Sequence, residues 1–196
     1  MSQHTVQQLP SQSASSWLKG YYATRFAFSA IWVTAAFTVA KTAPGLAAAL
    51  LVIYPAWDAI ANYADADRSG GLAQNKSQLL NFIVSIVTAV AVAIALTKGM
   101  PAVVFVFGIW AAFAGLFQLV TGVRRWKTIG AQWAMILSGA QSVLAGAHML
   151  VKAGGADPLG ITTIAPYAAF GAFYFLISSI SLAVIDARRG HAPTAA

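Results

Sequence analysis

The sequence predicts an all-α integral membrane protein, with six transmembrane helices arranged as three tandem helical hairpins. Of its 196 residues, 59% are apolar and only 9% are charged, against about 45–50% and about 25% in an average soluble domain. A soluble fold of this size has too little interior to hide so much apolar surface. The apolar residues also fall into six runs, each close to the roughly 20 residues that a helix needs to cross a bilayer.

The expected transmembrane helices follow these runs along the chain. They cover residues 17–40, 44–64, 78–97, 101–121, 132–151 and 161–185. Ser15 or Ser16 can cap the first helix, and Pro44 and Pro101 fall in first helical turns, where proline is tolerated. The chain lacks the segments of alternating polar and apolar residues that a transmembrane β-barrel requires. We therefore expect one membrane domain over residues 17–189.

The distribution of basic residues predicts the orientation of the helices. One side of the membrane is expected to carry nine basic residues and the other side three. The first group is Lys19, Arg25, Arg68, Lys76, Arg124, Arg125, Lys127, Arg188 and Arg189, and the second is Lys41, Lys98 and Lys152. The positive-inside rule places the richer side, with both termini, in the cytoplasm. Residues 1–16, which lack the features of a signal peptide, are expected to form a disordered cytoplasmic tail, and residues 190–196 a second one.

Internal similarity favours three hairpins of two helices each. Gln78 precedes Lys98 by twenty residues, and Gln132 precedes Lys152 by the same interval. The second helix of each hairpin carries a related motif, YPAW at 54–57, FGIW at 107–110 and FGAF at 170–173. Glycines recur every seven residues at 108, 115 and 122, and again at 139 and 146. This spacing is typical of helices whose backbones approach closely, although a glycine hinge that moves during transport is an alternative.

The most specific stretch of the chain is GIWAAFAGLFQLVTG at residues 108–122, which continues through Trp133 to Gly146. It resembles the HdeD-like acid-resistance membrane proteins, a short-repeat family of unknown function. The resemblance extends over roughly residues 22–189, but Arg25 and Asp58 depart from the apolar pattern of the family. It implies six helices in the bacterial inner membrane and, for some members, a part in acid-stress tolerance. The family supplies no catalytic residues to carry over.

Polar residues within the predicted spans are the candidate site, because ionisable groups are costly in a membrane. They are Arg25, Asp58, Asn81, Gln118 and Gln141. Arg25 and Asp58 are each sixteen residues from the turn between their helices, and Asn81 and Gln118 are each eighteen from theirs. Each pair therefore lies at one depth, about 24–27 Å from the outer turns. We predict an ion pair between Arg25 and Asp58.

Three interpretations of these polar groups remain open. They are interhelical contacts, each worth about 0.6–2 kcal/mol, a polar cavity open to the cytoplasm for a proton or small solute, or, for Arg25, a side chain that extends toward lipid headgroups. His148, four residues before Lys152, is a candidate pH sensor because its unperturbed pKa is about 6.5. A packing role at the membrane boundary is the alternative for His148.

No enzyme signature is recognisable in the sequence. Cys and Glu are both absent, and the three His residues are far apart, so thiolate, paired-Glu and His-based metal sites are not expected. We predict no catalytic residue, no metal and no cofactor. The basic residues lie in short runs between apolar segments, unlike the concentrated basic face of a nucleic-acid-binding protein.

The leading prediction is a non-enzymatic inner-membrane protein of a stress-associated family. Its expected partners are the lipid bilayer and, through association, further copies of itself or other membrane proteins. The alternative is a small transporter or channel subunit with a cytoplasm-facing polar site at Arg25 and Asp58. A transporter should have a water-filled cavity that reaches Asp58, whereas a structural protein should have that level closed. Against transport, the hairpins offer neither an inverted repeat nor a broken helix at the midplane.

Overall fold

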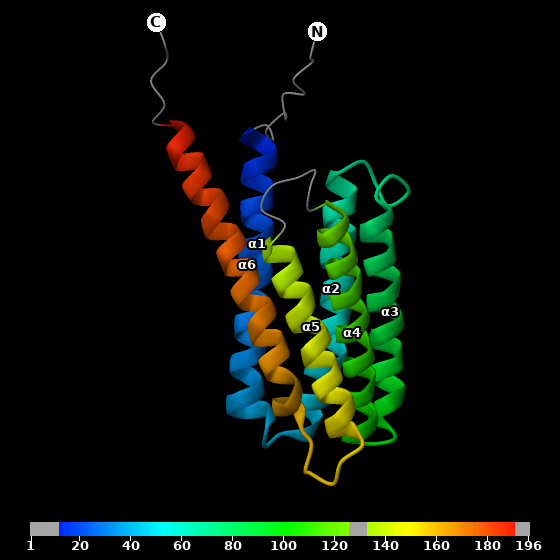
Figure 1. Cartoon of the computed structure of the whole chain (residues 1–196). Coiled ribbons are helices and arrows are strands. Elements are labelled where there is room, and N and C mark those ends of the chain that lie inside the picture. The colour runs from blue at the N-terminus through cyan, green and yellow to red at the C-terminus, as the bar shows by residue number, and fades with distance from the viewer. Residues whose placement is uncertain (1–11, 126–132, 191–196) are drawn as a thin grey trace, which may run out of the picture.

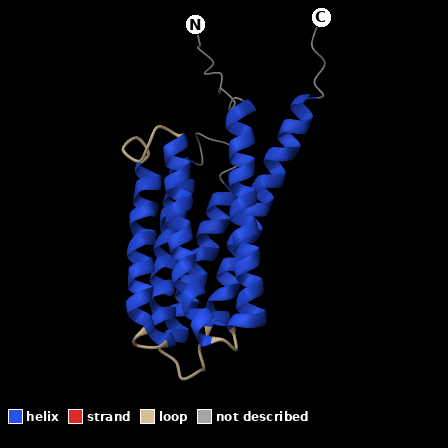
Figure 2. Ribbon diagram, turned by 180° about the vertical axis from the view of Figure 1, so that it is seen from behind, coloured by secondary structure: helices blue, strands red, loops and turns tan. Residues whose placement is uncertain are grey.

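The computed structural model describes residues 12–125 and 133–190, which form an antiparallel bundle of six α-helices (Figure 1). The helices are α1 (Gln12–Ala35), α2 (Pro44–Arg68), α3 (Lys76–Leu96), α4 (Met100–Arg125), α5 (Trp133–Ala153) and α6 (Ile161–Gly190). A π-helical turn, η1 (Ala36–Ala40), continues α1. These ranges contain no strand (Figure 2). The all-helical prediction is therefore confirmed for this part of the chain.

The helices agree with the predicted segments, apart from their ends. The clearest difference is that α1 begins at Gln12 rather than near residue 17. Residues 12–16, which were predicted to be part of a disordered tail, are thus helical. Gly190, the first residue of the second predicted tail, is the last residue of α6. The rest of the two predicted tails, residues 1–11 and 191–196, lies outside the described ranges.

Five of the helices are long and apolar enough to cross a membrane. They are α1 with η1, α2, α3, α4 and α6. Helix α5, of 21 residues, is not among them, and it carries Gln141, Ser142, His148 and Lys152 within its described part. Length and composition of the described residues therefore support a multi-pass membrane protein with at least five spans.

The helices that pack most extensively differ from the predicted hairpins. The main contacts are made by α4 with α5, by α2 with α3, and by α1 with α6. Helices α1 and α2, predicted to form the first hairpin, make few close backbone approaches, and so do α5 and α6. The first and last helices lie side by side and close the bundle (Figure 1). The repeat in the sequence therefore marks helices that are joined by a turn, not those that share the largest interface.

The predicted glycine stripes explain the closest of these interfaces. A Cβ atom added to Gly115 would lie 2.5 Å from the carbonyl oxygen of Gly139, and one added to Gly146 would lie 2.6 Å from the carbonyl oxygen of Gly108. The hydroxyl of Ser142 donates to the carbonyl oxygen of Ala111 across the same contact, at 2.9 Å. Small residues thus let the backbones of α4 and α5 touch, which confirms the packing interpretation for Gly108, Gly115, Gly139 and Gly146.

Large aromatic side chains fill the centre of the bundle. Trp32 of α1, Tyr54 of α2, and Phe107 and Trp110 of α4 are all buried. The ring of Trp32 lies 4.9 Å from that of Tyr54, between centroids, and its indole N–H donates to the carbonyl oxygen of Leu50 at 2.8 Å. These side chains hold α1 and α2 together at mid-height while keeping their backbones apart. We call the end of the bundle where α1 begins and α6 ends the terminal end.

Candidate functional site

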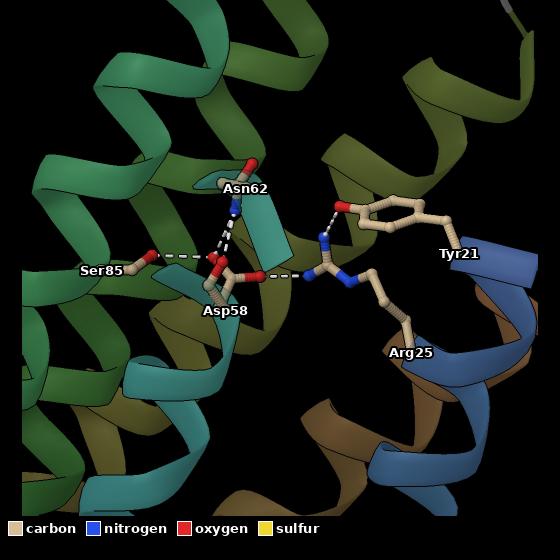
Figure 3. A network of polar contacts seen from close by, with 5 residues as sticks. All are labelled: Tyr21, Arg25, Asp58, Asn62 and Ser85. Atoms are coloured by element: carbon tan, nitrogen blue, oxygen red, sulfur yellow. Dashed lines mark hydrogen bonds and ion pairs between the residues drawn. The ribbon is translucent and has the colours of Figure 1, made fainter. Parts of the chain in front are cut away.

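Arg25 of α1 and Asp58 of α2 form an ion pair between the two helices, as the depth argument predicts (Figure 3). Nη2 of Arg25 contacts Oδ1 of Asp58. The two side chains are 14% and 20% exposed, so the pair is largely shielded by the surrounding helices. A lone charge within a membrane span costs about 2.5–3.5 kcal/mol on insertion scales. The ion pair reduces this cost for both residues.

Two further side chains complete the hydrogen bonding of the Asp58 carboxylate. Ser85 of α3 donates its hydroxyl to Oδ2 at 2.7 Å, and the amide of Asn62, one turn along α2, donates to the same oxygen at 3.0 Å. The Asn62 amide also donates to the backbone carbonyl oxygen of Asp58 at 2.8 Å. Figure 3 shows these donors converging on the carboxylate from α2 and α3, opposite the guanidinium. Both oxygens of Asp58 are therefore occupied.

The guanidinium of Arg25 has its own set of partners. Nη1 donates to the hydroxyl of Tyr21, one turn earlier in α1, at 2.9 Å. The centre of the guanidinium lies 4.2 Å from the ring centroid of Phe175 in α6, at the distance of a cation–π contact. The network thus joins α1, α2, α3 and α6 at one level. The Nε atom of Arg25, however, is buried without a hydrogen-bond partner among the described residues.

The remaining predicted residues do not join this network. Asn81 is half-buried on α3, one turn before Ser85, and Gln118 is exposed on α4. The side-chain oxygen of Gln141 accepts a hydrogen bond from the hydroxyl of Tyr174 at 2.8 Å, which links α5 to α6. The structure therefore brings together only Arg25 and Asp58 of the five candidate residues.

His148 is exposed on α5, far from the ion pair in the fold and close to the end that carries Lys152. Nζ of Lys152 contacts Oδ2 of Asp157, in the connection to α6, at 2.5 Å. The hydrogen bond from Lys152 and its positive charge lower the pKa of Asp157 below its ordinary value of 3.8. No group of three or more His, Cys, Asp or Glu side chains within the described ranges is placed to hold a metal ion. The role of His148 as a pH sensor stays a prediction.

A groove lies between α1 and α2 on the terminal-end side of the ion pair. It has a volume of about 360 Å³ and is lined by residues within 16–25 of α1 and 57–64 of α2. Along the two helices, Arg25 and Trp57 are the lining residues farthest from the terminal end, which we call the deep end of the groove, and Ser16, Trp17 and Ala64 are nearest to it, which we call its mouth. Asp58 is not among the lining residues. The cavity that a transporter requires therefore reaches the guanidinium but not the carboxylate.

Sequence reasoning missed several members of this site. Ser85 lies one helical turn after Asn81 on α3. The face of α3 that meets the ion pair could therefore be predicted, although Ser85 itself was not. Phe175 comes from α6, and no pattern in the sequence indicates that α6 packs on α1. The groove depends on Gly20, Ala61 and Ala64 facing one another across two helices, which requires knowledge of the rotation of both helices.

One family matches part of the chain. Residues 83–151 match a family described as a short repeat of unknown function (DUF308). The matched range includes most of α3, all of α4, and α5 as far as Val151. The match contains the whole α4–α5 glycine interface and leaves out Arg25 and Asp58. Comparison with curated proteins gave no match. Comparison with solved structures gave none either.

Proposed function

We propose that this chain is a non-enzymatic, multi-pass protein of the bacterial inner membrane that takes part in acid-stress tolerance. The observation that carries this proposal is the match of residues 83–151 to the short-repeat family, which includes the HdeD-like proteins. The residues of the resemblance, 108–122 and on to Gly146, lie within that match and include the four glycines of the α4–α5 contact. We therefore base the proposed role in acid tolerance on this matched segment.

The ion-pair network supports a structural role for its charges. Both oxygens of Asp58 accept hydrogen bonds from other helices or from Asn62, and an acid or base that acts on a substrate must be free to exchange a proton with it. Among the described residues, the strongest polar interactions therefore connect helices to one another. A proton or solute path through Asp58 would have to break three of these contacts, which counts against the transporter alternative.

Survival of bacteria at low pH tests the acid-tolerance proposal. A strain that lacks the gene should survive acid exposure less well than its parent, while both should grow equally at neutral pH. Reintroducing the wild-type gene should restore survival. Reintroducing the Gly115→Leu variant, which disrupts the α4–α5 contact, should not restore survival. The matched control is Gly45→Leu, which should restore it because a Cβ atom at Gly45 meets nothing within 4 Å. Equal survival of the deletion strain and its parent at low pH would remove the proposed role.

The proposed orientation places both termini in the cytoplasm, on the basis of the nine-to-three distribution of basic residues. Single Cys residues at Thr42, Gly99 and Ala156 should react with a membrane-impermeant thiol reagent added to spheroplasts. Single Cys residues at Ser69, Thr128 and Ala192 should react only after the membrane is permeabilised. The chain has no Cys of its own, so each label reports one position. The opposite pattern of labelling would reverse the orientation.

A further inference from the structure

The groove between α1 and α2 has the size and lining of a ligand site. Its volume of about 360 Å³ falls within the range of about 300–1,000 Å³ found for small-molecule sites. Gly20 and Thr24 of α1 and Ile60 and Ala64 of α2 form most of its apolar walls. Ile60 is 58% exposed, so this wall continues onto the outer surface of the bundle, where a membrane protein meets lipid.

Three hydrogen-bond donors belong to side chains that line this groove. In the part of the chain that the structure describes, the buried side-chain atoms without a hydrogen-bond partner are Nε1 of Trp17, Nε of Arg25 and Nε1 of Trp57. All three residues line the groove. A buried donor that lacks an acceptor is costly, at about 1–3 kcal/mol, and such groups are rare in proteins. The three nitrogen atoms are themselves shielded from solvent, so a ligand in the groove reaches them only when these side chains shift.

Arginine side chains lie at both ends of the groove, and that of Arg25 is neutralised by its ion pair with Asp58. The guanidinium of Arg25 forms its deep end, and that of Arg68 lies 4.6 Å from the ring centroid of Trp17 at its mouth. No acidic side chain is among the lining residues. Asp58 lies behind Arg25 and is already saturated by its partners. The groove therefore favours an anion at the mouth, next to an apolar channel.

We propose that the α1–α2 groove binds an acidic phospholipid of the leaflet at the terminal end. Its phosphate lies at the mouth, beside Trp17 and Arg68, and its acyl chain follows the apolar walls. Basic pockets between transmembrane helices bind anionic headgroups in this way, and charge-assisted hydrogen bonds to phosphate are strong. Lipid is the fitting occupant because the groove opens through Ile60 to the side of the bundle, not only to its end.

The deeper donors fit the ester carbonyl groups of the same lipid. Trp17 and Arg25 are eight residues apart in α1, which is about 12 Å along the helix axis. The Arg25 side chain extends back toward the terminal end, as its hydrogen bond to the Tyr21 hydroxyl shows (Figure 3). This brings Arg25 nearer to the level of a headgroup at the mouth. Trp57 of α2 lines the same groove, so the two side chains lie on either side of the position below the phosphate.

Native mass spectrometry of the full-length protein in detergent tests this site. The protein is mixed with equal amounts of phosphatidylglycerol and phosphatidylcholine that have the same acyl chains. We expect one bound phosphatidylglycerol, preferred over phosphatidylcholine at least about fivefold. Gly20→Leu should reduce its binding at least about fivefold, because a Cβ on Gly20 meets nothing within 4 Å and a larger side chain there fills the groove. The control Gly45→Leu, equally unobstructed on α2 but away from the groove, should bind as the wild type does.

A second pair of variants tests the charge at the mouth. Arg68→Gln should lower the preference for phosphatidylglycerol about threefold, whereas Arg188→Gln, which removes an exposed charge from the same end of the bundle on α6, should not. Added inorganic phosphate in large excess should leave the bound lipid in place. The proposal is wrong if the wild type binds both lipids equally or if Gly20→Leu binds like Gly45→Leu. Displacement of the lipid by phosphate would assign the site to a free anion instead.

Discussion

The α4–α5 pair and the α1–α2 pair are held together by different kinds of contact. In α4–α5, Gly108, Gly115, Gly139 and Gly146 bring the backbones into contact. In α1–α2, aromatic side chains hold the backbones apart, and the Arg25–Asp58 ion pair spans the gap. The glycine contact leaves no room for a single added carbon, whereas the spaced contact leaves a groove of about 360 Å³. Close packing and a groove are thus properties of different helix pairs in the same bundle.

The family match follows this division. Residues 83–151 contain the glycine interface and exclude the ion pair and the groove. Within that match, small residues at intervals of seven let α4 and α5 pack closely. The ion pair and the groove lie outside that match, whereas Ser85 of α3, which donates to Asp58, lies within it.

The largest effect is expected from Gly115→Leu. The first carbon of the new side chain would lie 2.5 Å from the carbonyl oxygen of Gly139 and 2.6 Å from the backbone nitrogen of Val143. Backbone atoms cannot rotate away, so α4 and α5 must separate, at a cost above the about 1–3 kcal/mol that is usual for overpacking. Folded yield in detergent should fall severely, while Gly45→Leu should retain wild-type yield. Normal yield of Gly115→Leu would show that the helices are not in backbone contact.

Removal of one partner of the ion pair should have the next largest effect. Arg25→Ala and Asp58→Ala each leave an unpaired charge, at a cost of about 2.5 kcal/mol. The double variant should lose less than the sum of the two, and the exchange Arg25→Asp with Asp58→Arg should recover part of the loss. Thermal unfolding in detergent measures all four proteins. Strictly additive losses would mean that the two side chains do not interact, and α1–α2 would then depend on its aromatic contacts alone.

A smaller loss is expected from Ser85→Ala. The substitution removes one donor from Oδ2 of Asp58 but leaves Arg25 and Asn62 in place, so the free energy of unfolding should fall by about 1–2 kcal/mol. Ser181→Ala, at an exposed position of α6, is the matched control. The same comparison in the Asp58→Ala background should show almost no effect of Ser85→Ala. An undiminished effect there would place the role of Ser85 outside the ion-pair network.

The smallest effect concerns the loop between α5 and α6. Because the pKa of Asp157 is lowered by Lys152, its contribution to stability is present above pH 3.8 and is lost as the pH falls through the lowered pKa. Asp157→Asn should therefore reduce the melting temperature at pH 7 by at most about 2 °C, as expected for an exposed pair. The difference from the wild type should persist at pH 5 and vanish in stronger acid. The control is Asp67→Asn, at an exposed position of α2.

The helices and the ion pair could be predicted because both depend on distance along the chain. Apolar runs of suitable length gave the helices, and equal separation from a turn put Arg25 and Asp58 at one depth. The same argument also paired Asn81 with Gln118, which the structure does not bring together. Depth fixes only one coordinate of a side chain. The rotation of each helix fixes the direction in which it points, and Gln118 points outward.

The helix pairing could not be predicted for a different reason. Connection by a short turn makes two helices neighbours, but the size of their interface depends on how closely their side chains let them approach. Glycine stripes indicated the α4–α5 contact because their effect is local to two helices. The α1–α6 contact rests on scattered interactions, such as the hydrogen bond from the Ser179 hydroxyl to the carbonyl oxygen of Lys19 at 3.2 Å. No spacing in the sequence marks such a contact.

The position of α6 against α1 has a consequence for synthesis of the chain. Lys19 and Asp186, whose side chains pair at 3.3 Å, are 167 residues apart, whereas Arg25 and Asp58 are 33 apart. At a translation rate of about 5–20 residues per second, roughly 2–7 s separate the synthesis of Arg25 from that of Asp58, and roughly 8–33 s separate Lys19 from Asp186. The charge of Arg25 is therefore neutralised early, whereas Lys19 and the face of α1 that packs on α6 gain their partners only when the last helix is made. A chain released before residue 161 would keep the ion pair and leave that face of α1 uncovered in the bilayer.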